Sequence, residues 1–340
     1  MMRTYIIAEA GVNHNGDIGL AHRLVEEAKK CGCDCVKFQT FSAESLVTQK
    51  AEKANYQKKN TGNNDSQYSM LKKLELKAKD FIELKLHCDD LGIDFLSTPF
   101  DVQSVDLLEQ IGVAKYKLSS GDITNMPLLK YIARKEKPII LSTGMCVMDE
   151  VKEAVNWIEE ENNHNIILLH CTSNYPTPFE DVNMRAMLTL KESFSYPVGY
   201  SDHTEGIIIP IMAVSMGARV IEKHFTLDKS LEGPDHKASL NIWELRDMVE
   251  AIRNIEAAMG DGVKLPVSQE LETRIAARKS LVAGHDMMAG HIIEEKDISV
   301  KRPGSGIAPK YIKEIIGKKL VKKVMKDELL DWSLLENRVE

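Results

Sequence analysis

Cysteine is scarce in this chain, and its spacing matches neither a disulfide framework nor a zinc site. Only six of the 340 residues are cysteine, and none lies beyond Cys171. Cys31, Cys33 and Cys35 alternate, but no fourth ligand follows at zinc-finger spacing. We therefore interpret this stretch as a helix end that turns into a strand, with Cys35 as a small buried residue. The lack of a disulfide pattern is typical of a reducing compartment.

Long apolar runs are also missing. No segment approaches the roughly 20 apolar residues that a membrane span needs. The first residues, Met1 to Ala8, lack the apolar region and cleavage site of a signal peptide and lead directly into a strand-like run. These features predict a cytoplasmic protein with no membrane partner.

Positive charge is too dispersed to indicate nucleic-acid binding. The net charge is −7, and charged residues make up an ordinary 28 % of the chain. The most basic stretch, Lys310 to Lys326, contains one aromatic residue and no recognition motif. We interpret it as a solvated helix face and expect no nucleic-acid partner.

What the chain does contain is a regular alternation of short apolar runs and amphipathic helical stretches. Eight such units, in an α/β pattern with strands unbroken by polar alternation, predict a (β/α)₈ TIM barrel. An open doubly wound sheet is the alternative, but Gly11–Gly16 is not the glycine-rich turn expected after its first strand. The predicted strands are Tyr5–Glu9, Cys35–Gln39, Asp94–Thr98, Lys115–Ser119, Ile139–Thr143, Ile166–Cys171, Val198–Ser201 and Arg219–His224.

The composition divides the chain into a barrel over 1–262, a helical linker over 263–279 and a small module over 280–340. The module contains a faint internal repeat and a Gly/Pro-rich loop, Lys301–Ile307. Within the barrel, residues 41–77 form an unusually long polar connection. A connection of that length predicts a lid or an arm.

Polar side chains cluster where the predicted strands end, and a barrel gathers those ends around one mouth. Two of them, His203 and His224, end neighbouring parallel strands, so they can share one metal ion. The other strand-end residues that we single out are Glu9, Asn13, His14, Lys37, Gln39, Thr98, Lys117, Ser120, Ser142, Thr143, His170, Thr172, Ser201 and Glu222.

With these motifs in order, the sequence resembles the sialic acid synthase family, a barrel followed by an antifreeze-like (SAF, β-clip type) domain. The resemblance covers essentially the whole chain. It rests on Ala8–Gly16, Val36–Thr40, Leu96–Phe100, Lys117–Gly121, Leu141–Met145, His170–Pro178, Ser201–Thr204, Glu222–Thr226, Gly233–Asp235 and Arg302–Ile307.

The resemblance implies a reaction in which phosphoenolpyruvate joins an N-acyl mannosamine-type sugar. His203 and His224 would hold Mn²⁺ or Mg²⁺, which suits an open shell rich in oxygen ligands and would polarise the sugar aldehyde. A phosphate and a carboxylate need cationic and hydroxyl partners. The implied phosphoenolpyruvate contacts are Lys37, Thr98, Lys117, Ser120, Ser142 and Ser201, with Lys117 also counted as catalytic.

Water must add to C2 of phosphoenolpyruvate, and that step needs a general base. The family usually has Glu directly after the Ser-Gly of the fourth strand, whereas this chain has Asp122, one methylene shorter. The base is therefore either Asp122, acting through a water, or Glu9. The resemblance also implies Tyr175 and Asp235 as sugar contacts. Arg302 would reach the N-acyl group from the partner subunit, which requires a domain-swapped homodimer.

The leading hypothesis is N-acetylneuraminate synthesis from N-acetylmannosamine. The alternative within the family is an N,N′-diacetyllegionaminate synthase that uses 2,4-diacetamido-2,4,6-trideoxymannose. Outside the family, we considered a Schiff-base aldolase using Lys37 or Lys117, and a non-enzymatic sugar- or ice-binding protein. The paired lysines and histidines at the strand ends argue against a non-enzymatic binding protein.

Overall fold

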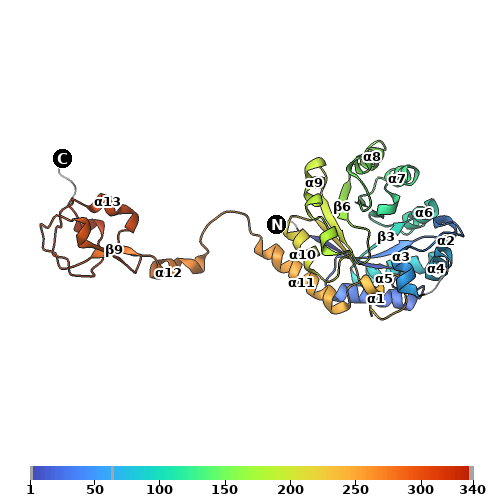
Figure 1. Cartoon of the computed structure of the whole chain (residues 1–340), viewed down its shortest axis with the longest axis horizontal. Helices are drawn as coiled ribbons and strands as arrows, with labels where there is room; N and C mark the ends of the chain where they lie inside the picture. Colours follow the sequence, from blue (N-terminus) through green and yellow to red (C-terminus); the bar gives the residue numbers. More distant parts are fainter. Residues whose placement is uncertain (1–2, 63–64, 337–340) are drawn as a thin grey trace. The chain divides into compact units, whose positions relative to one another are not determined.

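The computed structural model describes residues 3–62 and 65–336. The chain forms two compact units, Met1–Asp261 and Gly262–Glu340 (Figure 1). The first unit ends one residue before the end of the barrel predicted over 1–262. Each unit has its own apolar core.

The first unit is a barrel of eight parallel strands, as predicted. The sheet order is β3-β2-β1-β8-β7-β6-β5-β4, and β3 and β4 lie against each other so that the barrel is nearly closed. Every predicted strand overlaps an observed one. The strands are β1 (Tyr5–Gly11), β2 (Cys35–Thr40), β3 (Asp94–Pro99), β4 (Tyr116–Leu118), β5 (Ile139–Ser142), β6 (Ile166–Cys171), β7 (Val198–Asp202) and β8 (Val220–His224).

Helices cover the outside of the sheet (Figure 1). The first of them shows why: Ala21, Leu24, Val25 and Ala28 are buried at helical spacing on one face, and Asp17 caps its N-terminus by accepting from the Leu20 N–H. The covering helices are α1 (Ile18–Lys30), α5 (Ala78–Leu91), α6 (Val102–Gln110), α7 (Met126–Ala133), α8 (Met148–Glu159), α9 (Arg185–Ser193), α10 (Ile208–Ser215) and α11 (Ile242–Ala258).

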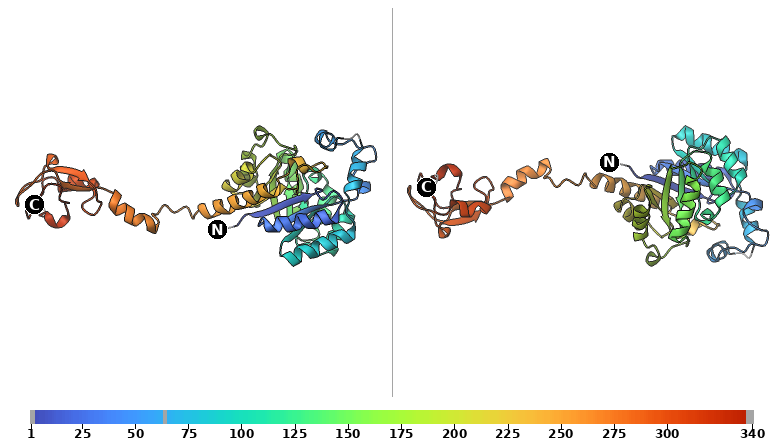
Figure 2. Two further views of the ribbon diagram at one scale, coloured as in Figure 1. Left: turned by 90° about the horizontal axis from the view of Figure 1, so that it is seen from below. Right: turned by 90° about the horizontal axis from the view of Figure 1, so that it is seen from above.

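The long connection after β2 is structured. We call residues 41–62 and 65–77 the arm. It contains α2 (Ala43–Leu46), α3 (Asn55–Thr61) and α4 (Gln67–Leu74), which lie on the side of the unit opposite the beginning of β1 (Figure 2). The arm has a small apolar cluster of its own, which includes Met70 and Leu71 from α4.

The second unit contains α12 (Ser268–Ala277), an antiparallel pair β9 (Ser280–Ala283) and β10 (Ile298–Lys301), and the short α13 (Ile312–Ile315). Here the predicted helix face over Lys310–Lys326 is wrong beyond α13. Gly317 adopts a left-handed φ of 82°, after which Leu320 and Val324 turn inward and make isolated β-bridges instead.

The cysteine interpretation is confirmed. Cys31 follows α1 as its C-cap, Cys35 begins β2, and all three alternating cysteines are buried and unpaired. Across the described ranges 3–62 and 65–336, none of the helices combines the length and the apolar character of a membrane span.

Candidate active site

The interior of the barrel is layered, because every second residue of each strand points inward. The lower layer is apolar and packs as one cluster: Ile7, Cys35, Leu96, Ile140, Leu169 and Val220. Two residues further along the same strands, the side chains become polar or reactive: Glu9, Lys37, Thr98, Ser142, Cys171 and Glu222. The apolar layer closes the barrel floor, so the polar layer faces the mouth.

This polar layer lines a cavity of about 500 Å³. Most of the site residues predicted from the sequence contribute to its wall: Glu9, Lys37, Thr98, Lys117, Ser120, Ser142, Tyr175, Ser201, His203 and His224. Asp122 and Asp235 are not part of that wall, and Arg302 lies in the second unit.

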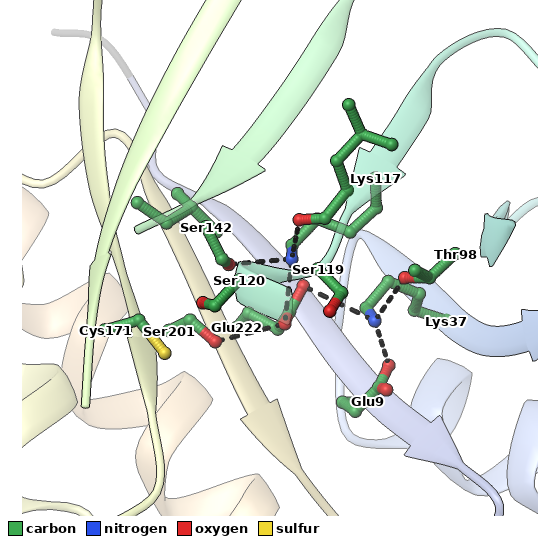
Figure 3. Close-up of polar contacts among 12 residues, drawn as sticks. Glu9, Lys37, Thr98, Lys117, Ser119, Ser120, Ser142, Cys171, Ser201 and Glu222 are labelled. Atoms are coloured by element: carbon green, nitrogen blue, oxygen red, sulfur yellow. Dashed lines mark hydrogen bonds and ion pairs between the residues drawn. The ribbon is translucent and has the colours of Figure 1, made fainter. Parts of the chain in front are cut away.

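Two buried lysines face each other across one carboxylate. Glu222 lies between Lys37 and Lys117 (Figure 3), with its Oε2 3.8 Å from Lys37 Nζ and its Oε1 3.6 Å from Lys117 Nζ. Lys37 also pairs with Glu9 Oε2 at 2.8 Å. All four side chains are almost fully buried. Charged groups in such a site interact strongly, because little water screens them.

Hydroxyl groups surround the two ammonium groups. Lys37 Nζ donates to Thr98 Oγ1 at 3.1 Å, and Lys117 Nζ donates to Ser142 Oγ at 2.7 Å. Ser201 Oγ donates to Glu222 at 3.1 Å. The result is a compact set of cationic and hydroxyl donors at one end of the cavity, which we call the lysine end. Such donors are what a phosphate or a carboxylate needs.

Burial and the paired charges shift the titration of these groups. Burial lowers the pKa of Lys117, whereas Glu222 and Glu9 more than offset burial at Lys37 and raise its pKa. Burial would raise the pKa of Glu222, but Lys117 and Lys37 outweigh it and lower that pKa. Glu9 behaves differently, because burial raises its pKa to about 7 despite the Lys37 charge. A carboxyl group with that pKa can exchange a proton near neutrality.

The two histidines lie side by side next to the lysine end, with ring centroids 5.6 Å apart. His203 Nδ1 donates to the Thr172 carbonyl oxygen at 2.7 Å, which leaves the lone pair on Nε2 and fixes the ring. His224 Nδ1 is buried and, among the described residues, has no hydrogen-bond partner. These are the features of two available nitrogen ligands, so the pair fits a divalent metal.

A metal at this pair would have few protein ligands. Within residues 3–62 and 65–336, no three His, Cys, Asp or Glu side chains are grouped as a metal-binding cluster. Water and substrate oxygens would have to complete the coordination shell, which suits Mn²⁺ or Mg²⁺.

The opposite end of the cavity is aromatic. Tyr175 lies against His203 with ring centroids 4.1 Å apart, and Tyr56 of α3 stacks on Tyr175 at 4.8 Å. Asp235 is also buried. Burial, with a smaller contribution from the Asp235 charge, raises the pKa of both tyrosines. Burial raises the pKa of Asp235 to about 6.

Asp122 directly follows the lining residue Gly121 but is not itself part of the cavity wall, and Arg302 belongs to the second unit. Asp122 is buried in the turn after β4, and its Oδ1 accepts from Asn125 Nδ2 at 3.2 Å. Its pKa is raised by burial. Arg302 is exposed in the loop after β10 of the second unit.

Sequence reasoning missed two parts of this site. Glu222 was noted beside the histidines but was not assigned to the site, although it precedes His224 by two residues and so shares its face of β8. The arm residues Tyr56, Gln57 and Gln67 also line the cavity. No sequence pattern identified these residues, because the sequence of a polar connection does not show which part of the barrel it will contact.

Comparison with known proteins agrees with this geometry. The NeuB family model matches residues 24–264, and the SAF domain model matches residues 278–336. The chain is 51 % identical to an N,N'-diacetyllegionaminic acid synthase from Campylobacter jejuni, over 97 % of this chain and 99 % of that protein. It is 48 % identical to the N,N'-diacetyllegionaminic acid synthase of Legionella pneumophila, over 98 % of this chain and 95 % of that protein.

A solved structure is similar as well. The N-acetylneuraminic acid (sialic acid) synthetase of Leptospira borgpetersenii, crystallised with citrate, superposes with a TM-score of 0.70 at 36 % identity. The match covers 80 % of this chain and 90 % of that one. The chain therefore belongs to the NeuB family and is a transferase of the sialic acid synthase type.

Proposed function

We propose that the chain condenses phosphoenolpyruvate and water with 2,4-diacetamido-2,4,6-trideoxymannose to give N,N′-diacetyllegionaminate and phosphate. The observation that carries the reaction type is the pair of buried lysines, Lys37 and Lys117, beside two ligand-like histidines in one cavity. The acceptor differs from our leading sequence hypothesis, N-acetylmannosamine. Relatives about half identical to this chain are diacetyllegionaminic acid synthases, which favours the alternative.

Phosphoenolpyruvate would occupy the lysine end. Lys37 and Lys117 supply two positive charges. Thr98 and Ser142 contact these ammonium groups, and Ser201 contacts the Glu222 carboxylate between them. Ser120 accepts from the Gly144 N–H at 2.8 Å, so its own hydroxyl hydrogen can point into the cavity. Binding there would hold C3 of phosphoenolpyruvate toward the histidines.

The acceptor would lie between the histidines and the tyrosines. His203 and His224 would hold Mn²⁺ or Mg²⁺, which would polarise the sugar aldehyde as a Lewis acid. Tyr175 and Asp235 are the proposed sugar contacts of this chain. Attack by C3 on the aldehyde carbon leaves C2 electron-poor, and water then adds to C2.

For that addition we propose Glu9 as the general base. It lines the cavity, whereas Asp122 is not among the lining residues and accepts a hydrogen bond from Asn125. Loss of phosphate from the tetrahedral carbon by C–O cleavage completes the reaction. In this scheme Lys117 stays protonated and stabilises the departing phosphate.

We also propose that Arg302 serves the acceptor's N-acyl group in a partner subunit, as the resemblance implies. Its exposed position in a loop leaves its guanidinium group available for such a contact. The chain would then act as a domain-swapped homodimer.

A phosphate-release assay tests the proposed function. Purified protein is given phosphoenolpyruvate with the diacetamido sugar, with N-acetylmannosamine, or with neither, before and after EDTA treatment and Mn²⁺ or Mg²⁺ addition. We expect phosphate release only when both an acceptor sugar and a metal are present. The kcat/KM should be higher for the diacetamido sugar than for N-acetylmannosamine. Burial lowers the pKa of Lys117, a property that a Schiff-base aldolase would also need. Borohydride trapping of the protein with pyruvate, without metal, would identify that activity instead.

A further inference from the structure

Tyr56 is placed in the cavity by a segment that is otherwise outside the barrel. The arm is anchored by its own apolar cluster, which includes Val12, Met70 and Leu71. It is also tied to the loop after β8, because Asn60 Nδ2 donates to the Pro234 carbonyl oxygen at 2.7 Å. The arm is therefore a fixed part of the cavity wall in this structure.

The arm contributes the outer aromatic surface of the cavity. Tyr56 stacks on Tyr175 with an interplanar angle of 27°, and its neighbour Ala54 also lines the cavity. Tyr56 is half-buried, and none of the α3 residues is a core residue. A large aromatic ring that supports no core and faces a substrate cavity is available to contact a ligand.

The two ends of the cavity differ in chemistry. The lysine end is charged, whereas Tyr56 and Tyr175 supply aromatic surface at the tyrosine end. The proposed acceptor differs from N-acetylmannosamine at two positions away from its aldehyde. It has an acetamido group in place of a hydroxyl at C4 and a methyl group in place of a hydroxymethyl at C6. Both changes add apolar surface or remove a hydroxyl, so an aromatic wall favours them.

We infer that Tyr56 is a specificity-determining residue that packs against the C4 and C6 substituents of the acceptor and favours the diacetamido 6-deoxy sugar over N-acetylmannosamine. This inference rests on the proposed function. The aldehyde end of the sugar faces His203, and Tyr175 lies between His203 and Tyr56, so the far end of the sugar reaches the α3 ring. An apolar pocket discriminates by about 10- to 200-fold for one added or missing methylene group.

The test compares kcat/KM for both sugars in wild type, Tyr56→Ala, Tyr56→Leu and Tyr56→Phe. For Tyr56→Ala we expect about a 10- to 100-fold loss with the diacetamido sugar and less than about a 3-fold change with N-acetylmannosamine. Tyr56→Phe keeps the ring and should stay close to wild type, with Tyr56→Leu in between. The KM for phosphoenolpyruvate should not change, because its site is at the lysine end.

Lys59→Ala, an exposed change on the same helix, is the matched control and should leave both sugars unaffected. Thermal unfolding checks that each variant is folded, which we expect since α3 buries no core residue. Equal losses with both sugars, or no loss with either, would overturn the role of Tyr56 while leaving the proposed function intact. A wild-type protein that does not turn over the diacetamido sugar would overturn both.

Discussion

At the scale of single residues, this barrel uses buried lysines in two different ways. Lys223 points outward from β8, is fully buried, and is satisfied by Asp202 Oδ2 at 2.5 Å and by the Thr204 carbonyl oxygen. Asp202 also accepts from the Thr204 N–H and hydroxyl. This ion pair therefore fixes the backbone on both sides of His203 and next to His224. Lys37 and Lys117 instead face the cavity, where their charges are available to a substrate.

The buried pair of Lys223 should therefore contribute more to the stability of the barrel than an exposed lysine pair does. Lys223→Met should lower the free energy of unfolding of the barrel by about 3–5 kcal/mol, because it leaves the Asp202 charge buried and unpaired. Lys229→Met is the matched control, since Lys229 pairs with Glu244 at the surface and should cost at most about 1 kcal/mol. Urea unfolding measures both. Similar small losses in the two variants would show that the buried pair does not stabilise the loop.

The catalytic base gives a second prediction at this scale. Glu9→Gln should lower kcat by about 100-fold or more while the KM for phosphoenolpyruvate changes little, as expected for losing a general base. Asp122→Asn should have a smaller effect on kcat, because Asp122 lies outside the cavity wall. Steady-state kinetics of the two variants decide between them. A larger loss in Asp122→Asn would assign the base to Asp122 instead.

Most of the site residues could be predicted because strand ends in a barrel converge by geometry. Lys37, Lys117 and His224 lie in predicted strands and His203 directly follows one, so the strand pattern identifies them. Glu222 could have been predicted as well, because side chains two residues apart in a strand point to the same face and His224 of β8 was already assigned to the site. Tyr56 could not, because its place depends on the packing of the arm, and that packing arises from contacts far apart in the chain.

At the scale of elements, the strands were predictable and the short helices were not. An unbroken apolar run has few alternatives to a buried strand, and each of the eight was found. By contrast, α3 buries no residue, so no hydrophobic period identifies it. In the second unit, the basic side chains over Lys310–Lys326 hid two inward residues, Leu320 and Val324.

One element of the second unit carries a pH-dependent contact. The buried Asp297 precedes β10 and accepts from His285 Nε2 at 3.0 Å and from His291 Nε2 at 2.7 Å. Burial would raise the pKa of Asp297, but hydrogen bonds from His291, the Glu294 N–H and His285 lower it to about 2. Two hydrogen bonds raise the pKa of His285: the larger effect comes from its bond to the Asp286 carbonyl oxygen, and the next from its bond to Asp297.

The sign of the stability change follows from these shifts. The His285 contribution is complete below its unfolded pKa of about 6.5 and is lost as pH rises through its higher folded pKa. The Asp297 contribution is present above about pH 4 and is lost only as pH falls toward 2. Stability of the β9–β10 pair should therefore fall as pH rises from about 6.5. Amide hydrogen exchange, corrected for intrinsic rates, measures this, and Asp297→Asn should weaken the dependence. An unchanged dependence in that variant would contradict the assignment.

At the scale of the whole molecule, the chain combines a barrel that contains the cavity with a second unit that has its own core. The proposed role of Arg302 requires the second unit of one chain to serve the barrel of another. Such an arrangement makes each active site depend on two subunits.

Subunit mixing tests that dependence. Arg302→Ala and His203→Ala should each be nearly inactive with the proposed acceptor. When the two proteins are mixed and allowed to exchange subunits, activity should return, because one site of the mixed dimer then has both an intact His203 and an intact Arg302. Lys310→Ala, an exposed change near the same loop, is the control. Mixing it with His203→Ala should give no more activity than the Lys310→Ala protein has alone. A monomer in solution, or no recovery after demonstrated exchange, would rule out the swapped arrangement.

The central claim is that this cavity joins phosphoenolpyruvate to the diacetamido sugar with addition of water at C2. The most direct measurement is product analysis by mass spectrometry after reaction in ¹⁸O-labelled water with metal, phosphoenolpyruvate and 2,4-diacetamido-2,4,6-trideoxymannose. We predict N,N′-diacetyllegionaminate with the label on its C2 oxygen and unlabelled phosphate. Label in the phosphate, or no legionaminate at all, would contradict the account.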